Sequence, residues 1–198
     1  MIHPSDRRPT DSALAHPDAA VTADDLARMR DGKSYEVVNG QMGPRRASVL
    51  ASLVEGKAIT LLNSYCELQR LGVVLSGSNG FQCFSTPLTV RKPRGSFINR
   101  RRFTTNFFHE EFLSIHPDLA VEVVSSHDEF AEVIEKVEEY LAAGIPLVWV
   151  IDPENEIVII HRKDGSVTKL HRNDDLTGED VLPGFTCKVA ELFPDASA

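Results

Sequence analysis

Residues 119–151 read LAVEVVSSHDEFAEVIEKVEEYLAAGIPLVWVI, a stretch that predicts a strand, a helix and a second strand. The apolar run at 119–124 is nearly continuous, as in strands that are buried on both faces of a sheet. A capping box of Ser126 and Glu129 marks the expected start of the helix. A glycine and a proline mark its end, just before the second apolar run at 147–151. Together these elements form a βαβ-like unit, which predicts a sheet flanked by helices.

Segments before and after this unit add two helices and several short strands. Apolar residues recur at helical spacing over 48–70, and Gly72 stops the pattern. A shorter helix is expected after Thr22, whose capping partner is Asp25, and it ends at Gly32. The expected strands lie at 35–40, which ends in an Asn-Gly turn, at 73–75, 81–84, 88–90 and 97–98, and at 157–160 and 167–170 around Asp164-Gly165.

Composition favours a single domain. The chain has 198 residues and a hydrophobic content of 42%, enough for one core, so we expect one domain at 21–198. Residues 1–20 have no apolar period and predict a disordered leader. No run approaches the roughly 18 apolar residues of a membrane span, and we expect a cytoplasmic protein. The widely spaced cysteines Cys66, Cys83 and Cys187 argue against disulfides and structural zinc.

A basic run at 91–102, RKPRGSFINRRR, stands out against the net charge of −8. Such an acidic balance argues against a protein that grips nucleic acid over its whole surface. The run predicts instead a local footprint for a polyanion such as DNA. The basic residues that we expect to contact it are Arg91, Lys92, Arg100, Arg101 and Arg102. A strand edge whose charge blocks unwanted pairing explains the run equally well.

Glu122 interrupts the buried strand at 119–124 and needs a partner. An ionised carboxylate out of water is costly unless it is paired or binds a metal. Lys136 is a candidate partner, because it borders the apolar stripe of the following helix and is the only basic residue there. The alternative is an exposed lysine that neutralises Glu132 and Glu139 at helical spacing, and the residues alone favour it.

Four blocks of sequence carry a resemblance to a known family. They read YEVVNGQM at 35–42, PDLAVEVVSS at 117–126, EKVEEYLAAGIPLVWVIDPE at 135–154 and VLPGFTCKVAELFP at 181–194. These blocks resemble the Uma-two family of endonucleases in the PD-(D/E)XK nuclease superfamily, and the similarity covers most of the chain from Thr22 onward. The resemblance implies an α/β (α+β) fold of the restriction-endonuclease type, with a mixed central sheet flanked by helices.

The same resemblance implies a metal site that hydrolyses DNA phosphodiesters. Its three parts are an Asp from a Pro-Asp pair, a Glu on the next central strand, to which Glu122 corresponds, and a Lys on the following helix, to which Lys136 corresponds. Mg²⁺ or Mn²⁺ suits such carboxylates because it prefers oxygen ligands. Where family members resemble VRKPDxSFI, however, this chain reads VRKPRGSFI at 90–98, with Arg94 in place of the aspartate. An arginine stays protonated and cannot ligate a metal.

Two other acids are candidates for the missing ligand. Glu36 resembles another acidic position of the family, which implies that it could bind the metal together with Glu122. A surface glutamate on an edge strand explains Glu36 equally well. Asp118 is rejected, because four residues of strand separate it from Glu122 by about 13 Å. Its expected role is to open the strand.

Two functional hypotheses follow. In the first, the chain is a metal-dependent DNA endonuclease that uses Mg²⁺ or Mn²⁺ and is impaired at Arg94. In the second, it is a pseudonuclease without a cofactor, in which Arg94 pairs with Glu122. The fold would then serve as a nucleic-acid-binding or protein-binding module. DNA is the expected partner, a membrane is not, and the residues leave a homodimer open.

Overall fold

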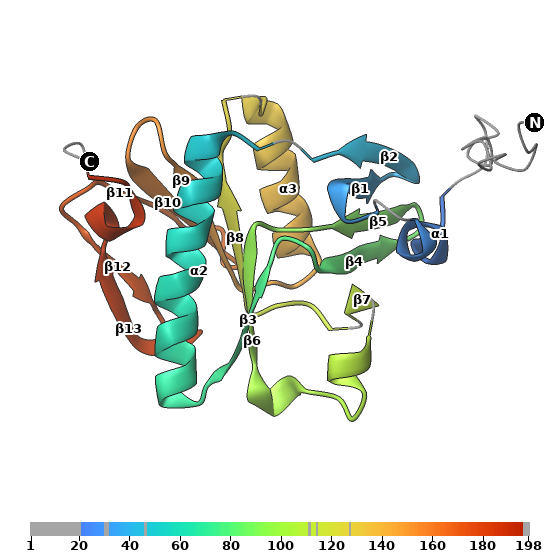
Figure 1. Cartoon of the computed structure of the whole chain (residues 1–198), viewed down its shortest axis with the longest axis horizontal. Helices are drawn as coiled ribbons and strands as arrows, with labels where there is room; N and C mark the ends of the chain where they lie inside the picture. The colour runs from blue at the N-terminus through green and yellow to red at the C-terminus, as the bar shows by residue number, and fades with distance from the viewer. Residues whose placement is uncertain are drawn as a thin grey trace, which may run out of the picture.

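The computed structural model describes residues 21–29, 32–45, 47–110, 112–113, 115–126 and 128–195, and the expected leader at 1–20 lies outside them. Within these residues a six-stranded sheet forms the centre of the molecule (Figure 1). In spatial order its strands are β11 (Val167–Leu170), β10 (Ile157–Arg162), β9 (Leu147–Asp152), β8 (Leu119–Val123), β6 (Gly95–Asn99) and β3 (Gly72–Ser76). β8 and β9 are parallel and the other pairs are antiparallel, so the expected mixed sheet and βαβ unit are confirmed.

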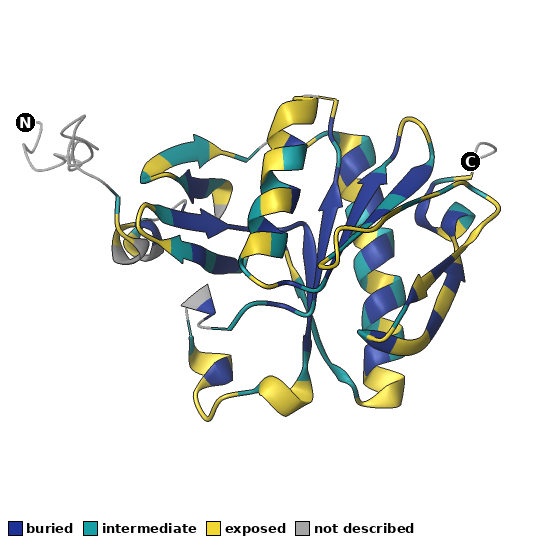
Figure 2. Cartoon of the chain, turned by 180° about the vertical axis from the view of Figure 1, so that it is seen from behind, coloured by how far each residue is buried: buried dark blue, intermediate teal, exposed yellow. Residues whose placement is uncertain are grey.

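One helix covers each face of this sheet. α2 (Val49–Gln69) lies on one face in Figure 1, and α3 (Phe130–Ala142) lies on the other face, which Figure 2 shows from behind. The odd-numbered residues of β8 pack in the apolar layer under α2, whereas Ala120 packs under α3. Successive side chains of a strand point to opposite faces. Glu122, in phase with Ala120, therefore faces α3.

A second sheet of five strands holds most of the amino-terminal strands. Its order is β2 (Gln41–Pro44), β1 (Tyr35–Val38), β5 (Leu88–Arg91), β4 (Gly80–Ser85) and β7 (Phe112–Leu113). The strands expected at 73–98 are thus divided between two sheets. The chain passes from β5 to β6 through Pro93, which has no N–H to donate to a sheet ladder. The crossover at 92–94 therefore leaves one sheet and enters the other.

Local signals in the sequence are confirmed at several ends of elements. Thr22 and Asp25 form the expected capping box of α1 (Ala23–Arg28). Asn39 and Gly40 have positive φ, as the predicted turn after β1 requires. The capping box that we expected before α3 is wrong, because the helix begins at Phe130 with Glu129 as its N-cap residue. The carboxylate of Asp128 instead accepts a hydrogen bond from the Ser125 amide, and this keeps the chain in a loop for longer.

A small carboxy-terminal hairpin completes the layer under α2. β12 (Asp175–Gly178) and β13 (Leu182–Lys188) pair with each other, and the short helix η4 (Val189–Leu192) follows. Their apolar side chains, among them Phe185 and Phe193, join the core that α2 shares with the sheet. Three further 3₁₀ helices are η1 (Gly32–Ser34), η2 (Arg100–Arg102) and η3 (Phe107–His109). Among the described helices, none combines the length and apolar character needed to cross a membrane.

Candidate functional site

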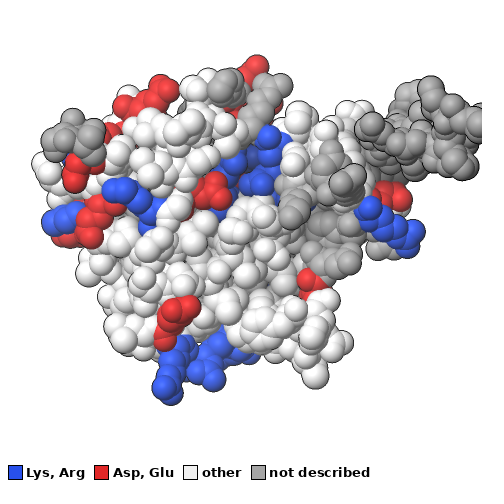
Figure 3. Space-filling view, in the orientation of Figure 1, with Lys and Arg blue, Asp and Glu red and all other residues white. Residues whose placement is uncertain are grey.

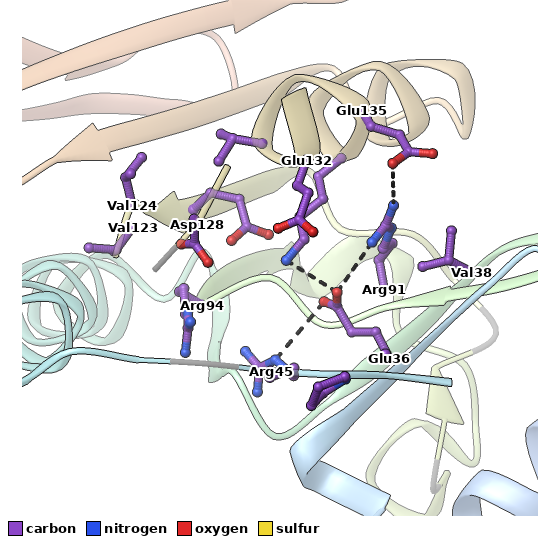
Figure 4. A pocket seen from close by; sticks show the side chains of 15 residues that line it. Glu36, Val38, Arg45, Arg91, Arg94, Val123, Val124, Asp128, Glu132 and Glu135 are labelled. Carbon is purple, nitrogen blue, oxygen red and sulfur yellow. Dashed lines mark hydrogen bonds and ion pairs between the residues drawn. The ribbon is translucent and has the colours of Figure 1, made fainter. Parts of the chain in front are cut away.

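A pocket of about 300 Å³ opens where the two sheets meet the first turns of α3 (Figure 4). The hairpin of β1 and β2 forms one wall, and the end of β8 with α3 forms another. The crossover between β5 and β6 lies below them. The ionisable side chains that line it are Glu36, Arg45, Arg91, Arg94, Glu122, Asp128, Glu132, Glu135 and Lys136. The folding pattern thus brings five of the predicted site residues to one cavity: Glu36, Arg91, Arg94, Glu122 and Lys136.

Glu122 is held by a buried hydrogen bond. Glu122 is only 5% exposed. Its Oε1 accepts a hydrogen bond of 2.6 Å from the hydroxyl of Tyr140, a fully buried residue of α3. Burial and the nearby Glu122 carboxylate raise the pKa of Tyr140 well above its ordinary value, so the phenol keeps its proton and donates. The tyrosine orients the carboxylate toward the pocket side of α3.

Lys136 lies one turn before Tyr140 on the same face of α3 and is largely buried. Its Nζ lies 3.1 Å from Oε2 of Glu36, on the other wall of the pocket. Burial lowers the pKa of Lys136, but the carboxylates of Glu122 and Glu36 outweigh that effect and raise it. The ammonium group is therefore charged and lies within electrostatic reach of both acids, in contrast to the exposed lysine that the residues alone favoured.

Glu36 is enclosed by nitrogen donors. Besides Lys136, the guanidinium of Arg91 approaches Oε2 to 3.3 Å, and Arg45 lies at 4.0 Å from Oε1 (Figure 4). The backbone N–H of Lys92 donates to Oε1 at 2.8 Å. Burial alone would raise the pKa of Glu36, but the cations, Lys136 first and then Arg91, lower it below its ordinary value. Glu36 is thus a buried anion, unlike the exposed edge-strand glutamate that was the alternative.

Arg91 and Arg45 connect the walls of the pocket. Arg91 pairs with Glu36 of β1 and also with Glu135 and Glu139 of α3, so it ties the helix to the smaller sheet. Arg45 donates hydrogen bonds to the carbonyl oxygens of Gly77 and Lys92. The acidic face of α3 therefore has a structural role, because two of its carboxylates are partners of one buried arginine.

Arg94 lines the pocket close to α2. Its side chain is 11% exposed, and its guanidinium lies 3.9 Å from the carboxylate of Glu55, a residue of α2. Burial raises the pKa of Glu55, and the charge of Arg94 opposes that rise. We expected Arg94 to pair with Glu122. The structure shows an ion pair between Arg94 and Glu55 of α2, on the α2 side of the pocket in Figure 4, and the pair of Arg94 with Glu122 stays a prediction.

The basic run at 91–102 is divided into two parts by β6. Arg91 is buried, and so is Lys92, which donates from Nζ to the carbonyl of Gly32 at 2.7 Å. Both take part in the internal structure of the pocket. Arg100, Arg101 and Arg102 are exposed and form η2 at the far end of β6. The side chains of this second part are the ones exposed on the surface, whereas Arg91 lines the pocket.

Asp118 has the structural role that we expected, at the start of β8. Its Oδ2 accepts a hydrogen bond from the Asn99 amide, and its Oδ1 pairs with Arg102, both at 2.8 Å. These contacts fix the start of β8 against the end of β6, away from the pocket.

The pocket side chains do not fit the divalent metal that the family resemblance implies. Such an ion needs several oxygen ligands. Among the described residues, no group of three His, Cys, Asp or Glu side chains is placed to hold one ion. The oxygens of Glu36 face nitrogen donors, and one oxygen of Glu122 accepts from Tyr140. Arg94 adds a further positive charge to the lining of the pocket.

Tyr140, Arg45 and Glu55 contact the predicted site residues but were not themselves predicted as part of the site. Tyr140 follows Lys136 by four positions, a spacing that places both on one helix face and signals a shared site. Arg45 and Glu55 carry no comparable signal. Arg45 follows a short edge strand, and Glu55 is one acid on a long amphipathic helix. Their contacts depend on the packing of distant elements.

Comparisons with known proteins show a similar fold and the family of the chain. The chain is similar to a crystal structure of a "putative nuclease belonging to DUF820" from Anabaena variabilis, with a TM-score of 0.69 and 17% sequence identity, over 80% of this chain and 89% of that one. That likeness concerns the fold. Among curated proteins, none matches the chain. Residues 20–190 match the family model Uma2, described as "Putative restriction endonuclease". The chain therefore belongs to the Uma2 family of restriction-endonuclease-like proteins.

Proposed function

We propose that this chain is a pseudonuclease, a nuclease-fold protein that binds nucleic acid without metal-dependent hydrolysis. The observation that supports this most is Arg94. A guanidinium lines the pocket where the family resemblance implies a metal-binding aspartate, and it cannot ligate a cation. A positive charge at that place also repels a divalent metal from the remaining acids.

The surroundings of Glu36 support the same proposal. A carboxylate that already has Lys136, Arg91 and a backbone N–H around it would have to give up these partners to bind a metal. Removing one partner of a buried ion pair costs about 3–5 kcal/mol. The charge of Glu36 is therefore balanced by protein groups alone, and its burial requires no cofactor.

Two measurements test the proposal. We expect the purified protein to leave plasmid DNA and single-stranded DNA intact in Mg²⁺ and in Mn²⁺. We expect Mn²⁺ to bind Arg94→Asp in calorimetry at least tenfold more tightly than wild type, because that change removes a cation and adds a ligand. Arg94→Asn, which removes the charge without adding a carboxylate, is the matched control. Metal-dependent cutting by wild type that Glu122→Ala abolishes would overturn the proposal.

A metal-dependent DNA endonuclease is the second candidate, and one observation favours it. Glu122 and Lys136 line the same pocket, and the charge of one acts on the other. In that case Glu122 would hold Mg²⁺ or Mn²⁺, and Lys136 would orient the attacking water or stabilise the developing charge. The cleavage assay separates the candidates, because only this one predicts cutting that requires both the added metal and Glu122.

A further inference from the structure

A second surface lies at the far end of β6 from the pocket. We call it the Arg–Phe surface and define it by Arg70, Arg100, Arg101, Arg102, Phe103 and Phe108. β6 begins at Gly95, next to the pocket, and ends at Asn99, directly before η2. Five residues of strand span about 16 Å. The surface is therefore separate from the site that the family resemblance indicates.

Three phenylalanines fix an exposed ring at this surface. Phe107 is only 4% exposed, and Phe103 stacks on it with ring centroids 4.3 Å apart and an interplanar angle of 10°. Phe108 meets both rings edge to face, at 5.6 Å and 5.1 Å, yet remains 74% exposed. A large apolar ring in solvent is unfavourable, and here its neighbours hold it in a defined orientation. It offers an open aromatic face to a ligand.

Arginines lie beside this ring cluster, on the side of Phe103. Arg100, Arg101 and Arg102 are exposed, and a hollow of about 390 Å³ beside them is lined by Arg70, Arg100 and Phe103 together with Cys66, Glu67 and Gly72. Figure 3 shows basic side chains gathered at the lower edge of the molecule, near the end of α2 and η2. Among the described side chains here, Glu67 lines the hollow, Asp118 pairs with Arg102, and Glu110 accepts a hydrogen bond from Thr104. The four arginines exceed these three acids.

The combination of arginines with an exposed aromatic ring has a specific chemistry. Guanidinium groups pair with phosphate oxygens, and an aromatic ring stacks on the face of an unpaired base. Bases inside a duplex stack on one another and offer no such face. We propose that the Arg–Phe surface binds single-stranded nucleic acid, with phosphates at Arg100 and Arg101 and a base on Phe108. This holds whether or not the pocket hydrolyses DNA.

Fluorescence anisotropy with a short labelled oligothymidine tests the proposal. We expect Phe108→Ala to weaken binding about 5-fold to 150-fold, the equivalent of one lost base stack. Phe130→Ala is the matched control, because Phe130 is 78% exposed at the start of α3, outside the Arg–Phe surface. We expect it to bind as wild type does. Equal affinities for the two variants would overturn the proposal, and so would the absence of oligothymidine binding by wild type.

The salt dependence of binding tests the arginines separately. Each phosphate contact on a single strand contributes about 0.7 to the slope of log affinity against log salt concentration. We expect Arg101→Gln to reduce that slope by about this amount. Lys169→Gln is the control, an exposed cation on β11 at the opposite edge of the six-stranded sheet from β3. A slope unchanged in Arg101→Gln, or tighter binding of the corresponding duplex than of the single strand, would contradict the proposal.

These results are independent of the test of the pocket. Metal-dependent cleavage by wild type would overturn the pseudonuclease and leave the Arg–Phe surface in place. Equal binding by Phe108→Ala and Phe130→Ala would remove the surface and leave the pseudonuclease in place.

Discussion

Lys136 and Glu36 form an ion pair across the pocket, with 3.1 Å between Nζ and Oε2, although one belongs to α3 and the other to the hairpin of β1 and β2. Their side chains are 22% and 6% exposed. The pair joins the central layer of the fold to the smaller sheet. Because water is largely excluded there, the pair affects stability far more than a surface ion pair would.

The first prediction concerns Glu36 and pH. The pKa of its carboxyl is lowered in the folded state, so its stabilising effect is present above the ordinary value of 4.5 and is lost as pH falls through the folded value. We expect Glu36→Gln to lower the free energy of unfolding at pH 7 by about 3–5 kcal/mol. Urea unfolding below pH 4.5 should show a shallower pH dependence in the variant. Glu154→Gln, at an exposed turn, is the control, and identical pH slopes for Glu36→Gln and wild type would refute the prediction.

The second prediction concerns the hydroxyl of Tyr140. Tyr140→Phe leaves an oxygen of buried Glu122 without its donor, so we expect a loss of about 1–3 kcal/mol of unfolding free energy. The control is Tyr65→Phe, which removes a hydroxyl that donates to the carbonyl of Pro183 at a solvent-exposed position. Thermal and urea unfolding compare the two variants. A smaller loss for Tyr140→Phe than for Tyr65→Phe would show that Glu122 does not depend on this bond.

The third prediction concerns Arg94 and Glu55. A double-mutant cycle of Arg94→Met and Glu55→Gln should give a coupling energy of about 0.5–3 kcal/mol, as for contacting residues. Arg94 opposes the rise in the pKa of Glu55 that burial causes. An NMR titration of Arg94→Met should therefore show the pKa of Glu55 higher than in wild type. An unchanged titration would mean that Arg94 is not the partner of Glu55 in solution.

The fourth prediction separates the two parts of the basic run. Arg91→Met removes one buried guanidinium from Glu36 and Glu139, and we expect it to lower the free energy of unfolding by about 3–5 kcal/mol. Arg101→Met, at an exposed position, should change it by less than about 0.5 kcal/mol. Chemical unfolding measures both. Equal losses of unfolding free energy in the two variants would contradict the prediction that the buried part of the basic run stabilises the fold more than the exposed part.

Much of the fold could be predicted from short-range patterns. The continuous apolar run before Glu122 predicted the central strand, and the helical spacing over 48–70 predicted α2 almost to the residue. These patterns report which faces are buried, and burial decides secondary structure. The division of the early strands between two sheets was not predicted, because strand pairing depends on partners far apart in sequence. Pro93 marks where the chain changes sheets, but it does not identify the new neighbours.

Two residues of the candidate site, Glu122 and Lys136, were singled out from the residues alone, and the family resemblance added Glu36 and position 94. Glu122, Lys136, Glu36 and position 94 were named in advance, and they line one pocket. Their partners were not, because Glu55 and Arg45 come from elements that meet only in the folded chain. The charge pattern of α3 favoured an exposed Lys136, and this interpretation was wrong. The residues of the helix alone cannot show that the smaller sheet lies against that part of α3.

Alternate side chains of β8 pack in two different apolar layers, so the register of the strand decides which layer each residue enters. Leu119, Val121 and Val123 are committed to the layer under α2, and Ala120 to the layer under α3. A single residue inserted before Glu122 would exchange the two sets and direct the carboxylate into hydrocarbon. The apolar neighbours of Glu122 in β8 therefore fix the direction of its side chain, although they take part in no reaction. Substitutions elsewhere in the pocket can change its function without changing this orientation.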